Sequence, residues 1–553
     1  RWQSLFERLA PPFLAKPLQL GVAALKHHPS LRLVAGVLLL LCGFLLVDTL
    51  VLRAGRIAAS GYHSPWLALA LYQRIGPVAL ALLVASLLCL LMYGGLARPW
   101  HAFQNGGLLR GFIVVLAAAI GWSLGTYSFN FYVDQAHLAD RLALLVLVPL
   151  LWWRPGFIVP FVLLAPLLLW QFGYPELGGS IFPHKLQVLH VLNLFAAFFL
   201  LRCACGFVRS IEFFFLTACA IASAYWLPAL GKFQIDWIEH VRLWLIPAAA
   251  ATHGWLADAP ASADVIAILR SINLPLALAV LLLEAAFLLL LADRRIALVL
   301  LGFAALFHVG VFVAYGFLFW TWILLDIAFL IVIWKLRNAQ FAAMRAPPPL
   351  LLSMLLIGLG TYWISPPKLA WHDTRLTYAF TVQAVTEDGR HWRLPGEYFA
   401  PYDDTITMMA FSYLVDEPGL LTSAYGVTDD ASLADAINSA RTLQDIEALE
   451  ILRGAHRYDA QRAAQFYEFL RTFVSNKERH AGRLEWLSRW RPPPQFWGFR
   501  GEYVPGTAKL VGLRIVFNTY FSDDLSHSLI RSRELNYLDL QDPYQPASGP
   551  IPQ

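Results

Sequence analysis

The sequence predicts a polytopic α-helical membrane protein that carries an α+β domain outside the membrane at its C-terminal end. Of the 553 residues, 58% are hydrophobic and only 14% are charged, whereas a soluble globular protein carries about 25% charged residues. Apolar runs long enough to cross a bilayer recur between residues 32 and 366. After Pro366 charged and turn residues are spread evenly, so residues 367–553 can form a core of their own.

This composition divides the chain into three parts. Residues 1–31 are polar and amphipathic, which is typical of a cytoplasmic or interfacial segment. Residues 32–366 form the transmembrane domain, and residues 367–553 form the extracytoplasmic soluble domain. We expect about eleven spans, near residues 32–52, 75–97, 109–128, 139–153, 156–173, 186–208, 211–230, 272–292, 296–316, 318–334 and 348–366.

The basic residues of the short loops predict the orientation. With eleven spans these loops alternate onto the side that holds the N-terminus, and lysine and arginine mark the cytoplasmic side. The N-terminus is therefore expected in the cytoplasm and residues 367–553 outside, across a bacterial inner membrane. The basic residues concerned are Arg98, Arg154, Arg202, Arg209, Arg294, Arg295, Lys335, Arg337 and Arg345.

Periodicity also predicts the elements outside the bilayer. Trp237–Ile246 is expected to form a helix lying in the membrane interface, within a long external connection over 236–268. Alternation and turn residues predict a small antiparallel sheet, and 3.6-residue periodicity predicts a helical insertion. The expected strands are 376–385, 391–393, 509–521 and 529–540, and the expected helices are 431–452 and 459–479.

Charge and cysteine content exclude several classes of function. The net charge is only +5 and no basic cluster resembles a nucleic-acid surface. All five cysteines fall in predicted spans, so the soluble domain is expected to lack disulfides. Cys203-x-Cys205 does not have zinc-ligand spacing and no histidine cluster accompanies it, so we predict no metal site.

The stretch Ala229–Glu239 holds the most informative charge. Lys232 stands at the end of a long apolar run. In a low-dielectric site the pKa of a lysine falls and the amine can act as a base. A lysine can instead extend to the interface and pair with an acid four residues away, here Asp236. The sequence leaves both interpretations open.

Four further ionisable residues lie in or beside apolar runs. His184 precedes a span, His190 lies one and a half turns later, and His308 and Glu284 lie within spans. Ionisable groups inside a membrane are costly and usually face an interior cavity. A single such histidine is more often a packing residue, but three histidines near a buried lysine favour a functional site.

These residues occur in an order that resembles a known family. Gly231-Lys232-x-x-x-Asp236-Trp237-x-Glu239 resembles the lysine motif of vitamin K-dependent gamma-glutamyl carboxylases and of the wider HTTM (horizontally transferred transmembrane) family. Ser180-x-x-x-His184, Leu281-Leu-Leu-Glu284 and Phe307-His308 also resemble features of the family, in the family's order. The resemblance covers residues 175–330, and it departs from the family where Gly231 replaces the first of two adjacent lysines.

The resemblance implies an HTTM-like fold for residues 32–366 and a carboxylase activity. Lys232 would be the base that deprotonates a reduced vitamin K or menaquinol-type quinol. O2 and CO2 would be co-substrates in the carboxylation of protein glutamate. His184 and His308 would line the catalytic site, and the pocket would include Glu284, Asp236, Trp237 and His190.

The resemblance also implies partners. They are membrane lipid, a quinone, and a protein or peptide substrate held by residues 367–553. A second hypothesis keeps the fold and omits the chemistry. The protein would then be a non-catalytic HTTM membrane subunit that binds quinone or lipid and docks a partner complex through its external domain.

Overall fold

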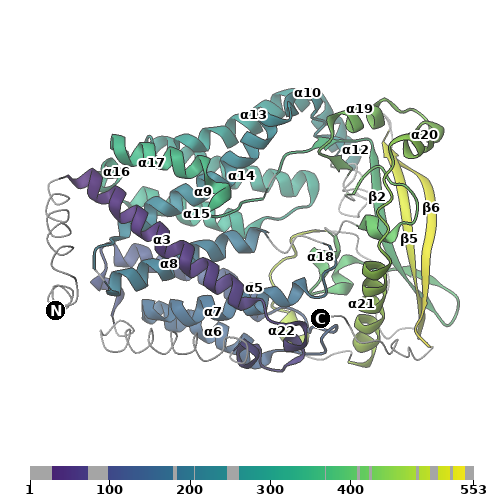
Figure 1. Cartoon of the computed structure of the whole chain (residues 1–553), viewed down its shortest axis with the longest axis horizontal. Helices are drawn as coiled ribbons and strands as arrows, with labels where there is room; N and C mark the ends of the chain where they lie inside the picture. The colour runs from purple at the N-terminus through teal and green to yellow at the C-terminus, as the bar shows by residue number, and fades with distance from the viewer. Residues whose placement is uncertain are drawn as a thin grey trace, which may run out of the picture.

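The chain folds into a helical part followed by a part that contains strands, as the computed structural model in Figure 1 shows. All described strands lie after residue 371, as expected for a C-terminal α+β domain. The structure describes residues 28–71, 98–178, 183–204, 206–245, 261–367, 369–407, 411–422, 426–480, 485–497, 509–522 and 527–541.

The helical part packs around an apolar core to which most of its helices contribute. The central helix, α9 (Ser210–Gln234), is buried along most of its length because other helices surround it. With α9, the described α-helices of this part are α3 (Pro29–Gly55), α5 (Gly106–Gly125), α6 (Leu138–Trp153), α7 (Ile158–Trp170), α8 (Pro183–Ala204), α10 (Trp237–His240), α12 (Ala261–Ser271), α13 (Asn273–Ala286), α14 (Arg294–Tyr315), α15 (Trp320–Lys335), α16 (Asn338–Met344) and α17 (Pro347–Gly358). The helices packed against α9 include α3, α8, α13 and α17.

Among the described residues, six helices are long and apolar enough to cross a membrane, or up to eight if each bent helix pair is one span. The bent pairs are residues 264–289, with a 72° bend, and residues 338–358, with a 64° bend. The expected count of eleven is therefore not confirmed. The expected spans at 139–153 and 318–334 are helices of only 16 residues, or about 24 Å, against a hydrocarbon core of about 30 Å.

Two other expectations concern the edges of the helical part. The expected span 75–97 and most of the expected interfacial segment 1–31 lie outside the described residues, although Pro29 already begins α3. The expected interfacial helix over 237–246 is wrong beyond His240. The backbone becomes extended at Val241, which ends α10 after a single turn.

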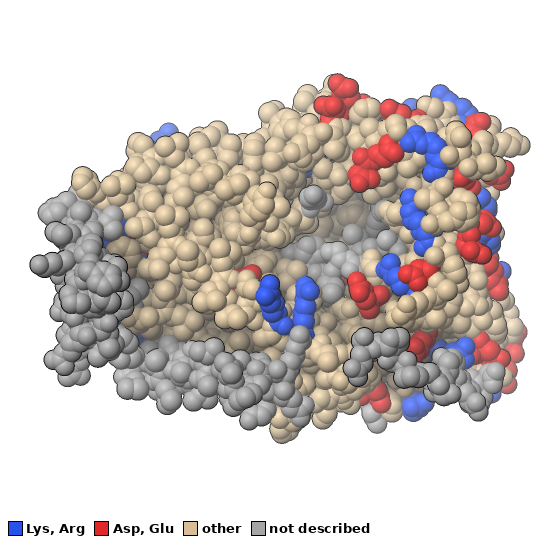
Figure 2. All heavy atoms as spheres, in the orientation of Figure 1, with Lys and Arg blue, Asp and Glu red and all other residues tan. Residues whose placement is uncertain are grey.

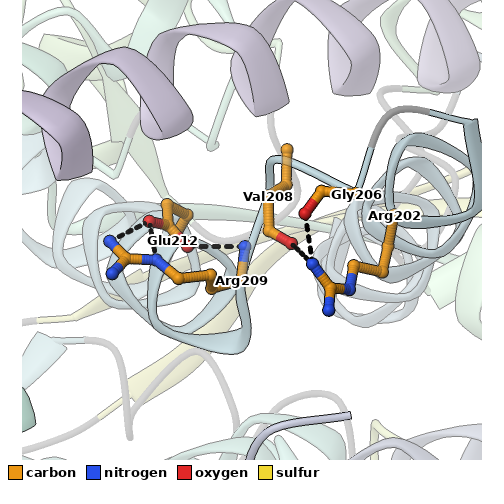
Figure 3. A network of polar contacts seen from close by, with 5 residues as sticks. All are labelled: Arg202, Gly206, Val208, Arg209 and Glu212. Carbon is orange, nitrogen blue, oxygen red and sulfur yellow. Dashed lines mark hydrogen bonds and ion pairs between the residues drawn. The ribbon is translucent and has the colours of Figure 1, made fainter. Parts of the chain in front are cut away.

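The turn between α8 and α9 is closed by charged side chains, as Figure 3 shows. Arg209 precedes α9, and its backbone N–H and guanidinium both donate to the carboxylate of Glu212, at 2.6–2.9 Å. The guanidinium of Arg202, near the end of α8, donates to the carbonyls of Gly206 and Val208. These bonds satisfy the N–H of Arg209 at the start of α9 and two carbonyls of the connecting turn.

The C-terminal part contains an antiparallel four-stranded sheet in the order β3-β2-β5-β6. Its strands, β2 (Leu376–Thr386), β3 (His391–Arg393), β5 (Leu510–Ser522) and β6 (His527–Asp539), lie close to the expected positions. The expected helices are also confirmed, with the first one divided at Ala440. They are α19 (Ala431–Ser439), α20 (Leu443–Arg453) and α21 (Ala460–Arg479).

The two parts share a core at their junction. Phe129 and Phe131 of the α5–α6 connection pack in one cluster with Phe469 and Phe473 of α21 and with residues of the sheet. The hydroxyl of Tyr402 lies 2.9 Å from the carbonyl oxygen of Tyr174, and Asn476 donates to the carbonyl of Phe131. The helical part is thus held directly against the strand-containing part.

Candidate functional site

Lys232 lies near the C-terminal end of α9 and is paired with Glu284 of α13. The lysine Nζ donates to both carboxylate oxygens of Glu284, at 2.6 Å each. The side chains are only 7% and 6% exposed. A charged group taken this far out of water requires a hydrogen-bonded partner of opposite charge, and Glu284 provides it.

Trp237 covers this ion pair. Its ring centroid lies 5.1 Å from Lys232 Nζ, within the range of a cation–π interaction. The chain can turn back over the lysine because Asp236 adopts a left-handed conformation, with φ of 51°, between α9 and α10.

The alternative pairing of Lys232 with Asp236 is wrong. That pairing requires four residues of continuous helix, but α9 ends at Gln234 and Asp236 lies outside the helical register. Its side chain is exposed. The partner of Lys232 is therefore an acid 52 residues further along the chain, which helical spacing could not indicate.

A second polar cluster lies two turns earlier on α9. The hydroxyl of Tyr225 donates to Asp326 Oδ2 of α15 at 2.6 Å, and it lies 2.9 Å from His308 Nε2 of α14. Since a hydroxyl has only one hydrogen, we assign His308 Nε2 as the protonated nitrogen that donates to Tyr225. All three side chains are buried.

The two clusters are connected through α9 and α13. Residues seven apart lie on the same helix face, so Tyr225 and Lys232 point to the same side of α9. The Tyr225 ring stacks on Phe287, with centroids 4.0 Å apart, and Phe287 follows Glu284 by three residues. The Lys232–Glu284 pair and the Tyr225 cluster therefore form neighbouring layers of one polar region.

Unsatisfied polar atoms occur at His308 and at Trp322 beside it. His308 Nδ1 and the Trp322 indole nitrogen are buried and have no hydrogen-bond partner in the structure, and the same holds for the hydroxyl of Thr321, which precedes Trp322 in the chain. The Trp322 and His308 rings contact each other, with centroids 5.2 Å apart. Buried polar atoms in native proteins nearly always have partners, so this group indicates a place where the polar atoms of a ligand or water can bind.

The strand-containing part covers the site at the end of α9. A Cβ added at Gly231 would lie 2.9 Å from Ala370 Cβ, so the backbone approaches residues 369–373 closely. Asp373 is buried there and accepts hydrogen bonds from the Arg242 backbone and the Trp371 indole. Burial raises the pKa of Asp373 to about 7, against the opposing effects of these hydrogen bonds and of the charges of Arg242 and Lys232.

The other predicted site residues lie apart from this region or are not described. His190 Nδ1 lies 2.9 Å from Asp48 of α3, which also accepts a hydrogen bond from Asn193. His190 makes no hydrogen bond or ion pair with Lys232 or Glu284, all three being described residues. His184 lies in the first turn of α8, and its side chain is outside the described part.

Sequence reasoning found Lys232, Glu284, Trp237 and His308 but missed Tyr225. The available signal was its position seven residues before Lys232, on the same helix face. Sequence reasoning also left out Asp326, whose partner Tyr225 lies on another helix and could not be identified from the sequence.

The side chains of the site can hold and exchange protons. The described residues contain no group of three or more His, Cys, Asp or Glu side chains that could hold a metal ion. Comparisons with protein-family models, with curated proteins and with solved structures find no match to this chain.

Proposed function

We propose that the helical part spans a membrane, with residues 367–553 outside a bacterial inner membrane and the N-terminus in the cytoplasm. Large apolar side chains are exposed along α3, α13 and α14, among them Leu46, Leu282 and Leu306. In Figure 2 this half of the molecule is almost free of charged side chains, which gather on the strand-containing half. An exposed apolar surface of this extent fits lipid and is rare on a soluble monomer.

Aromatic and basic side chains at one end of the helices support this placement. Trp153 lies beside Arg154, and Trp334 lies beside Lys335, each cation 4.7–5.1 Å from the ring centroid. Both tryptophans are exposed. Tryptophan concentrates at the membrane–water interface, and basic residues concentrate on the cytoplasmic side.

We further propose that the protein is an HTTM-family enzyme resembling vitamin K-dependent gamma-glutamyl carboxylases. The observation that carries this proposal is the buried contact of Lys232 Nζ with both oxygens of Glu284, next to the Tyr225–His308–Asp326 cluster. A quinol supplies reducing power and an acidic hydroxyl when it is bound. O2 and CO2 would be the other co-substrates.

The residues beside His308 fit such a ligand. Phe319 and Trp322 provide aromatic rings near His308, with centroids 5.2–5.6 Å from it. The unsatisfied His308 Nδ1 and Trp322 Nε1 supply an acceptor and a donor for the oxygens of a quinol. A flat aromatic ring with polar groups at its edges matches this combination of side chains.

Lys232 and Glu284 would move the proton. Transfer of one proton from Lys232 Nζ to a Glu284 oxygen converts the ion pair into a neutral amine and a carboxylic acid. The amine can then take a proton from a quinol hydroxyl, and Glu284 keeps the first proton until the site reopens. Trp237 and residues 369–373 cover the pair and keep water out, which protects a strong base.

One observation favours the alternative of a non-catalytic subunit that binds quinone or lipid and docks a partner complex. Both Glu284 oxygens are bonded to Lys232. An ion pair closed in this way can hold α9 against α13 without taking part in any chemistry. Binding of quinone beside His308 would then occur without turnover. The two proposals differ in whether Lys232 is needed for chemistry.

The test uses the purified full chain in lipid nanodiscs. It is incubated with a reduced naphthoquinone, O2, labelled bicarbonate and a glutamate-rich peptide, and quinone epoxide and acid-stable label are measured. We expect both products from the wild-type protein, and a loss of at least about 100-fold in Lys232→Ala because the base is gone.

Lys335→Ala, at the far end of α15, is the matched control and should keep its activity. Equal product from Lys232→Ala and wild type would contradict the role of the lysine. Saturable quinone binding with neither epoxide nor label would support the non-catalytic subunit instead.

A further inference from the structure

Residues 485–497 leave the strand-containing part and lie across one end of the helical part. The Trp122 indole, near the end of α5, donates to the carbonyl of Trp490. Leu318 N donates to the Gln495 carbonyl, and Trp497 N donates to the carbonyl of Gly316, which caps α14. The segment is therefore fixed to the ends of α5 and α14 and to the residues just before α15.

The first turns of this segment present aromatic and basic side chains outward. The short helix α22 (Glu485–Ser488) and the turn after it place Trp486, Arg489 and Trp490 at spacings of three and four residues, on one face. Trp486 is 54% exposed and Trp490 is 73% exposed, whereas Leu487 between them is buried. Exposing two indoles is costly unless something other than water contacts them.

The position of this face indicates what contacts it. α5, α14 and α15 are apolar, and the segment is bonded at the ends that point toward the strand-containing part (Figure 1). At the same level Trp122 and Trp320 lie together, with ring centroids 5.5 Å apart. If the helices span a bilayer, this level is the outer membrane–water interface, where indole rings are most stable.

We infer that Trp486 and Trp490 insert into the headgroup layer of the outer leaflet and that Arg489 contacts lipid phosphate. This inference rests on the proposed membrane span. The segment is attached to the helices by hydrogen bonds and to α21 through the chain, so its insertion fixes the height of the strand-containing part above the bilayer. That height keeps residues 369–373 in place over Lys232.

Site-specific photocrosslinking in liposomes tests the inference. The full chain is prepared with p-benzoylphenylalanine in place of Trp486 or of Trp490, irradiated, and analysed for covalent lipid adducts by mass spectrometry. An aromatic replacement preserves the size and apolar character of the side chain. Two control positions are Leu452, exposed on α20 in the strand-containing part, and Leu46, exposed on α3.

We expect lipid adducts at 486 and 490 in at least about tenfold excess over position 452, because indole-sized groups at the interface contact lipid directly. Adducts at Leu46 with none at 486 and 490, or crosslinks there to protein only, would overturn the inference while leaving the membrane span intact. No adduct at Leu46 either would instead overturn the proposed span and the inference with it.

Discussion

The helical part and the strand-containing part differ in how far their ion pairs are exposed to solvent. In the helical part Lys232 and Glu284 are almost fully buried and bind each other through two hydrogen bonds. In the strand-containing part, pairs such as Lys509–Glu387 and Arg390–Asp388 are largely exposed. Removing one member of a buried pair leaves an uncompensated charge, whereas an exposed charge is simply hydrated.

The difference shows where sequence features are informative about function. An exposed charge on the strand-containing part is ordinary for a protein surface, and its presence explains little. A charge buried in the helical part needs a partner, and where that partner comes from another helix, as for Lys232 and Glu284, it identifies a tertiary contact. The following predictions test this contrast, beginning with the largest expected effect.

Glu284→Ala should destabilise the protein by about 3–5 kcal/mol, because Lys232 would remain buried without a counter-charge. Glu534→Ala, in the edge strand β6, removes the partly exposed partner of Arg514 and should cost no more than about 1 kcal/mol. Thermal unfolding of both variants in the same detergent measures the difference. Equal losses would refute the proposed contrast between the two parts.

Tyr225→Phe should cost about 2 kcal/mol, because Asp326 and His308 each lose a buried hydrogen-bond partner. The control is Tyr378→Phe in β2, whose hydroxyl accepts a long hydrogen bond, 3.3 Å, from Leu420 N and bonds to no side chain among the described contacts. That variant should lose less. A larger loss in Tyr378→Phe, measured by the same unfolding assay, would show that the Tyr225 cluster is not the more strongly coupled network.

Gly231→Ala should cost about 1–2 kcal/mol, since the new methyl group would lie 2.9 Å from Ala370 Cβ and push the two parts away from each other. Gly310→Ala is the matched helical control, because a Cβ there meets nothing within 4 Å. It should leave stability unchanged or slightly raised. Proteolysis of residues 369–373 should accelerate only in Gly231→Ala, and equal rates in the two variants would contradict the close approach.

The last prediction concerns a change of stability with pH, caused by Asp373. Its pKa is raised from 3.8 to about 7 by burial, so the folded state holds a proton that the unfolded state releases. The contribution of Asp373 to the free energy of unfolding is therefore fully present at acid pH, and it is lost as the pH rises from about 4 to about 7. The slope cannot exceed about 1.4 kcal/mol per pH unit for one proton.

Asp373→Asn should flatten that slope because an amide does not titrate, and it keeps only one of the two oxygens that accept from Arg242 N and the Trp371 indole. Asp445→Asn provides the control. Hydrogen bonds from Arg441 N and Thr442 hold the pKa of Asp445 below its usual value, so its contribution changes only below about pH 4 and is constant where Asp373 titrates. Unfolding midpoints measured from pH 4 to 8 should diverge between the two variants, and parallel curves would refute the assignment.

The strand-containing part was the easier one to predict. Alternation in residues 376–385 and 509–521 predicts the two strands. The turn at 387–389 predicts the hairpin between β2 and β3. Both signals depend only on residues close together in the sequence. The first expected helix is divided at Ala440, where the backbone becomes extended and Thr442 begins a new capping box. Local signals of this kind need no knowledge of distant contacts.

The sequence by itself determined that the chain has an apolar helical part and a C-terminal strand-containing part, and it identified Lys232, Glu284 and His308 as unusual charges. It did so because hydrophobicity and periodicity are local properties. Only the tertiary structure decided that Lys232 pairs with Glu284 and not with Asp236, and that Tyr225 joins His308 to Asp326. The partners come from separate helices, and which helices become neighbours is fixed by packing over the whole bundle.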